Sequence, residues 1–101
     1  MNVHTYETNP GHLILSWGQD SASFYTIAYE LINRGHCQPI TSPKRVLLPD
    51  LLDRYTTHFI LTGLEPDSSY RVYVQSHYGI HSIVPVESHT EASTLQANGK
   101  A

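Results

Sequence analysis

Residues 64–74, LEPDSSYRVYV, contain the features that decide the fold. A proline-containing turn is followed by a stretch in which Tyr70, Val72 and Val74 share one side and the residues between them share the other. Such a period of two is typical of a β-strand with one buried and one solvent-exposed face. The stretch therefore predicts a tight corner followed by a half-buried strand.

The same alternation recurs along the chain. It is found at 12–17 (HLILSW), 24–31 (FYTIAYEL) and 57–64 (THFILTGL). Turn-forming residues separate these stretches, as in NPG at 9–11 and GQDS at 18–21. Short strands separated by polar turns predict an all-β sandwich or barrel.

Composition limits the class of protein. The chain has 101 residues, of which 40% are hydrophobic and 15% charged, which suits one domain. We expect that domain over 1–95 and a linker or disordered tail over 96–101. The single Cys37 excludes an intrachain disulfide, and the net charge of −3 disfavours binding to nucleic acid. No apolar run reaches the roughly 20 residues of a membrane helix, so we expect no membrane insertion by this segment.

The stretches HLILSW, YTIAYEL and LTGLEPDSSYRVYVQS, in this order, resemble a fibronectin type III domain, and the resemblance covers about residues 3–95. It implies a seven-stranded antiparallel Greek-key β-sandwich with sheets A-B-E and C′-C-F-G. The implied strands are A 3–8, B 12–18, C 23–32, C′ 44–48, E 57–63, F 69–77 and G 86–94. The predicted structural core comprises Trp17, Ile27, Leu61, Leu64, Pro66, Tyr70, Val72 and Val74.

Two of these core residues have specific expected roles. Trp17 lies on the inward side of its strand and offers the largest apolar surface in the chain. Tyr70 follows the proline corner, so its ring can enter the core while its hydroxyl bonds a backbone group a few residues upstream. This arrangement is the tyrosine corner of Greek-key sandwiches.

The sequence predicts no catalytic residues, no cofactor and no metal. Gly-x-Ser-x-Gly, phosphate-loop and His-Glu-x-x-His motifs are all missing. His77 and His81 have one interval found in zinc sites, but such a site needs three or four ligands. An enzyme is therefore the least favoured class.

The loop between strands F and G, residues 77–84 (HYGIHSIV), is the first candidate binding site. Large side chains on a loop held by a rigid scaffold are a common layout for recognition. The predicted partner-binding residues are Tyr78, Ile80, His81 and Ile83. The alternative is that an isoleucine of this loop folds back over the end of the core.

Residues 44–52, KRVLLPDLL, are the second candidate. They could form an edge-strand docking site. The favoured alternative is that Val46 and Leu48 fill the core, while Leu47 or Leu51 covers the sheet edge. A third surface, the outer face with Arg71 and Tyr73, could either bind protein or serve stability alone.

The resemblance implies a non-catalytic protein–protein interaction module of a larger receptor or adhesion-type protein. Its partners would be an unidentified protein and neighbouring domains, in an extracellular or cell-surface setting. Three alternatives remain open: a passive spacer, a module of a cytoplasmic scaffold, and an accessory module of a secreted bacterial enzyme.

Overall fold

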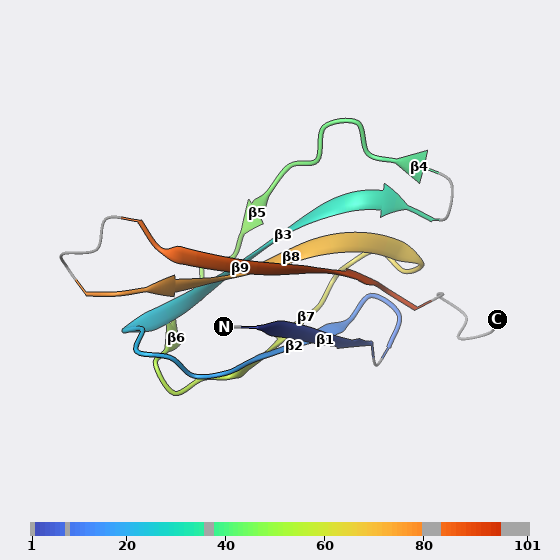
Figure 1. Ribbon diagram of the computed structural model, residues 1–101. Helices are drawn as coiled ribbons and strands as arrows, with labels where there is room; N and C mark the ends of the chain where they lie inside the picture. The colour runs from blue at the N-terminus through green and yellow to red at the C-terminus, as the bar shows by residue number, and fades with distance from the viewer. Residues whose placement is uncertain (1, 8, 36–37, 80–83, 96–101) are drawn as a thin grey trace.

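The computed structural model describes residues 2–7, 9–35, 38–79 and 84–95 (Figure 1). Its strands are β1 (Val3–Glu7), β2 (Leu13–Trp17), β3 (Phe24–Arg34), β4 (Gln38–Pro39), β5 (Val46–Leu47), β6 (Leu52–Asp53), β7 (His58–Leu61), β8 (Ser68–His77) and β9 (Val86–Ser93). The described ranges contain no helix, and hence none that could cross a membrane.

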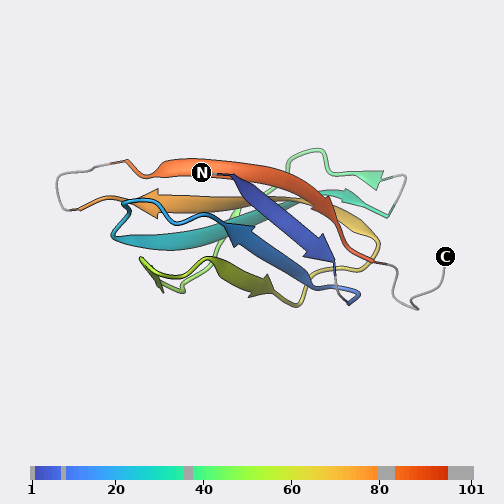
Figure 2. The ribbon, with the colours of Figure 1, turned by 60° about the horizontal axis from the view of Figure 1, so that its bottom comes forward.

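The strands form two antiparallel sheets that pack face to face (Figure 2). One sheet has the order β1-β2-β7. The other has the order β4-β3-β8-β9, with β5 and β6 also paired to β3. These are the predicted A-B-E and C′-C-F-G sheets, so the all-β sandwich is confirmed. Two strands of two residues each, β4 and β6, were not predicted.

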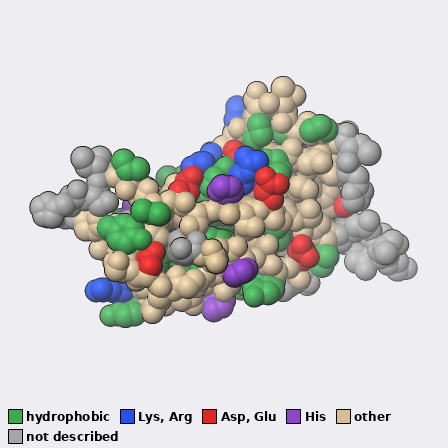
Figure 3. Space-filling view, viewed as in Figure 1, with side chains coloured by type: hydrophobic (Ala, Val, Ile, Leu, Met, Phe, Trp, Pro, Cys, Tyr) green, Lys and Arg blue, Asp and Glu red, His purple; other side chains and the backbone are tan. Residues whose placement is uncertain are grey.

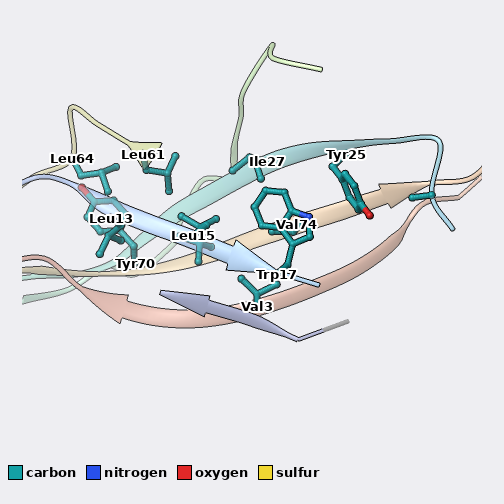
Figure 4. Close-up of a cluster of buried hydrophobic side chains, with 12 residues drawn as sticks. Val3, Leu13, Leu15, Trp17, Tyr25, Ile27, Leu61, Leu64, Tyr70 and Val74 are labelled. Atoms are coloured by element: carbon teal, nitrogen blue, oxygen red, sulfur yellow. The ribbon is translucent and has the colours of Figure 1, made fainter. Parts of the chain in front are cut away.

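The core lies between the sheets and follows from the alternation in each strand (Figure 4). In β2, for example, every second residue is buried, ending at Trp17, which is 3% exposed. The Trp17 ring meets the Tyr25 ring at a centroid distance of 5.6 Å. All predicted core residues except Pro66 are buried.

Pro66 was wrongly assigned to the core, because the structure exposes it. Pro66 and Asp67 form the turn before β8, and Asp67 adopts a positive φ of 53°. Proline suits such a turn because its φ is already restricted. The buried residues are those on either side of the turn, Leu64 and Tyr70.

The predicted tyrosine corner is present. The backbone N–H of Glu65 donates to the Tyr70 hydroxyl over 2.8 Å, and Tyr70 is otherwise buried. Nearby, Gly11 has a φ of 77°, and a Cβ built there would lie 2.6 Å from the Leu64 carbonyl oxygen. Both its backbone angle and this close approach require glycine. Together these contacts fix the end of the sandwich opposite the F–G loop.

Candidate functional site

One end of the sandwich, which we call the loop pole, brings together segments distant in sequence. Phe24 pairs with Asp53 on one side and with His77 on the other, which places three connections side by side. The Gln19 side chain also donates to the Arg54 carbonyl at 3.4 Å. The described parts of the loop pole are residues 18–23, 54–57, 78–79 and 84–85.

Asp20 is the centre of the hydrogen bonding at the loop pole. Its carboxylate accepts bonds from the Ala22 N–H (2.8 Å) and from the hydroxyls of Tyr25 (3.1 Å), Tyr78 (2.9 Å) and Ser76 (3.3 Å). Burial by itself would raise the pKa of Asp20. The four hydrogen bonds favour the charged form and outweigh burial, so the pKa lies below its ordinary value.

Tyr78, the first predicted partner-binding residue, is half-buried and packs against the core. Its hydroxyl bond to Asp20 raises the pKa of Tyr78, and desolvation adds to this. The next residue is held too, because the Gly79 N–H donates to the Ser23 hydroxyl at 3.1 Å. The start of the F–G loop is therefore fixed to the loop between β2 and β3. The other predicted binding residues, Ile80, His81 and Ile83, lie outside the described residues.

Two exposed apolar side chains belong to other segments of the loop pole. Tyr55 is 72% exposed and Val84 is 73% exposed. Tyr55 projects from a turn that Asp53 organises, since its carboxylate accepts from the Tyr55 N–H (2.9 Å) and the Thr56 hydroxyl (2.9 Å). The sequence analysis missed Tyr55. An Asp two residues before it is the signal of an Asx-type turn and could have indicated its exposure.

Polar side chains pair on the outer face of the larger sheet, and Figure 3 shows basic, acidic and His side chains gathered near the upper centre of the view. Arg71 bonds Glu91 at 2.8 Å and Glu30 at 3.2 Å, and the Tyr73 hydroxyl also donates to Glu30. The bonds with Glu91 and Tyr73 raise the pKa of Arg71. Arg45 continues the network, because its guanidinium lies 3.8 Å from the centroid of the Tyr73 ring.

The network reaches the loop pole through a chain of hydrogen bonds. Glu87 accepts from Arg45 at 2.7 Å and from the Gln75 amide at 3.0 Å. The Thr26 hydroxyl donates its only proton to the Gln75 oxygen at 2.7 Å. Thr26 must therefore accept its second bond, of 2.8 Å, from Nε2 of His77.

His77 also stacks on Phe24 with a centroid distance of 4.3 Å, and burial lowers its pKa. The Arg71–Tyr73 surface is therefore occupied with contacts inside the domain.

Within the described ranges, no group of three or more metal-ligating side chains occurs.

Residues 44–52 differ in part from the favoured prediction. Leu48 packs against the core as expected, but Val46 is 42% exposed. Its strand, β5, lies at the margin of the sheet, where the facing sheet does not cover it. Leu47 and Leu51 are also exposed, at 61% and 73%.

Comparison with solved structures identifies the fold. No protein-family model matches the chain, and no curated protein sequence matches it. The fibronectin type III domain of the human collagen α-1(XX) chain is similar with a TM-score of 0.69 and 18% identity, covering 100% of this chain and 88% of that one. A myokine has a TM-score of 0.59 and 16% identity, covering 94% of each chain. A computer-redesigned β-sandwich protein has a TM-score of 0.56 and 16% identity, covering 95% of this chain and 90% of that one.

The chain thus has the fibronectin type III fold, as the resemblance in residues 12–17 and 64–74 indicated. At these identities the similarity concerns the fold, and a fold by itself does not define a ligand.

Proposed function

We propose that this domain is a non-catalytic protein-recognition module of a larger receptor or adhesion-type protein, and that it binds its partner through the loop pole. The observation that carries the proposal is the exposure of Tyr55 and Val84 around a base that Asp20 holds in place. Aromatic and aliphatic groups on a rigid support lose little conformational entropy on binding. The predicted contacts in the F–G loop, Ile80, His81 and Ile83, complete the proposed surface.

The way in which titratable groups are engaged supports a non-catalytic role. Glu30 and Glu87 are committed to arginine partners, and the Asp20 carboxylate accepts four bonds from the surrounding framework. These groups stabilise loops and strands. The proposal places the parent protein outside the cell or at its surface, with a cytoplasmic scaffold as the alternative.

A spacer function is the second candidate, and the shape of the domain favours it. Val3 pairs with Trp17 near the loop pole, whereas the Leu95 carbonyl accepts a bond from the Asp67 N–H at the other end. The domain is also elongated, with extents of 46 × 27 × 21 Å. It could therefore set the distance between two neighbours without binding a further partner.

An affinity-capture experiment distinguishes the two functions. The intact domain and a Tyr55→Ser/Ile80→Ser variant are immobilised and exposed to membrane and cytosolic extracts. Tyr6→Ser is the matched control, because Tyr6 is also exposed but lies on β1, outside the loop pole.

Equal thermal stability of the three proteins is checked first. A protein retained by the intact domain and by Tyr6→Ser, but lost from the double variant, would support recognition through the loop pole. Identical retention by all three would reject this site and favour the spacer.

A further inference from the structure

A short stretch around β5, residues 44–50 (KRVLLPD), has features of an unpaired interface. Val46 and Leu47 are both exposed although they belong to a strand. Among the described elements, β5 pairs with β3 alone, and it lies at the margin of the molecule in Figure 1. One edge of β5 is therefore open.

The backbone of the open edge can be assigned from the pairing on the other edge. The Leu48 N–H donates to the Ile27 carbonyl at 2.9 Å, so it points toward β3. Successive N–H groups of a strand point to opposite edges. Both the N–H and the C=O of Leu47 therefore point away from β3. Unpaired strand edges of this kind are templates for pairing with another strand.

The charges around Leu47 define the orientation of a strand that could pair there. Lys44 lies three residues before Leu47 and Asp50 lies three residues after it. Both are exposed, and neither has a hydrogen bond or ion pair within the described part of the chain. If two copies pair antiparallel with Leu47 at the centre, each Lys44 lies opposite the Asp50 of the other copy. A parallel arrangement in register would place like charges together.

We propose that a second copy of this chain docks on β5 in this antiparallel register, with a twofold axis at Leu47. The two Leu47 residues would then exchange both backbone hydrogen bonds, and the larger sheets of the two copies would become continuous. A self-complementary patch of this kind is what twofold symmetry requires. This surface is separate from the loop pole, so the inference does not depend on the proposed function.

The structure also limits how strong the association can be. Pro43 and Pro49 lie on either side of β5, and proline has no N–H to donate to a neighbouring strand. The pairing therefore cannot extend along a long ladder. We expect a reversible dimer that dissociates on dilution, with its charge pairs weakened by salt.

The first test measures mass against concentration by sedimentation equilibrium. The intact chain should show a concentration-dependent monomer–dimer equilibrium, and Leu47→Lys should remain monomeric because it places two cations at the axis. Ile60→Lys on β7 is the matched control, since Ile60 is also an exposed strand residue but lies in the other sheet. It should dimerise like the intact chain.

The second test examines the register. Lys44→Asp and Asp50→Lys should each weaken the dimer about tenfold, because each change turns two exposed charge pairs into like-charge contacts. The Lys44→Asp/Asp50→Lys double variant should recover the original dissociation constant. Unfolding of each variant in urea verifies that the fold is unchanged.

Three results would overturn the proposal. The first is a monomer at every concentration, and the second is a dimer that survives Leu47→Lys. The third is a double variant as weak as its two parents, which would rule out the proposed register.

Discussion

Replacing Asp20 tests whether one carboxylate organises the loop pole. Asp20→Ala removes the acceptor for one backbone N–H and three hydroxyls. Two of the donors, on Tyr25 and Ser76, belong to fully buried residues. Hydrogen bonds to a charged group are worth about 1.5–3 kcal/mol each, and solvent reduces this at Asp20, which is exposed. We therefore expect a total loss of about 2–4 kcal/mol in the free energy of unfolding.

Urea unfolding followed by tryptophan fluorescence measures this loss, since Trp17 is the only tryptophan. Asp50→Ala is the matched control, because Asp50 is an exposed aspartate without a contact in the described chain. Such a loss is a large part of the free energy of unfolding of a typical domain, which is roughly 5–15 kcal/mol. If Asp20→Ala costs no more than Asp50→Ala, the reasoning about the loop pole is refuted.

The pH dependence gives an independent check on Asp20. Its pKa is lower in the folded state than the ordinary value of 3.8, so the unfolded state binds more protons in acid. The stabilisation is complete above the ordinary pKa and is lost as the pH falls through the folded pKa. Asp20→Asn should lack this part of the acid destabilisation while remaining folded at neutral pH.

Three further predictions concern the framework. Tyr70→Phe should lower the free energy of unfolding by about 1–3 kcal/mol, because the backbone N–H it accepts from loses its partner; a neutral result in urea would remove the corner bond from the account. Gly11→Ala should destabilise by more than about 1 kcal/mol, since its Cβ would collide with the Leu64 carbonyl, and an unchanged melting temperature would contradict this. His77 has a lowered pKa in the folded state, so the melting temperature should fall as the pH decreases below about 6.5; His77→Gln should reduce the slope, and equal slopes would exclude His77 as its source.

The main strands could be predicted because burial on one face leaves a period of two in the sequence. The strand predicted at 12–18 is observed as β2 at 13–17, and the strand predicted at 69–77 is observed as β8 at 68–77. Each end that was misplaced is therefore wrong by one residue. The tyrosine corner was also predictable, because Tyr70 and the N–H that it bonds are only five residues apart. Both the strands and the corner depend on residues that are close together in the sequence, so the local sequence pattern is enough to predict them.

The features that were missed depend on contacts between distant segments. Asp20 bonds Ser76 and Tyr78, which lie 56 and 58 residues away, so the sequence around Asp20 could indicate its local turn with Ala22 but not its contacts with β8 and the F–G loop. The exposure of Val46 follows from the position of β5 at the margin of the larger sheet. An alternating sequence pattern cannot show whether a strand lies at the margin or at the centre of a sheet. Pro66 was misplaced for a related reason: a turn next to two core residues can still project into solvent.

The pairing of β3 with β8 has a consequence for how the chain folds. These two strands form the centre of the larger sheet, yet contacts such as Thr26 with His77 join residues 51 positions apart. A long loop must therefore close before the central ladder gains stability, which makes folding slow, on the order of milliseconds to seconds. Strands β5 and β6 also pair with β3, but over shorter sequence separations than β8 does, so closing the loop to β8 remains the most costly step in assembling this sheet. Substitutions that weaken the pairing of β3 with β8 should therefore slow the folding step itself.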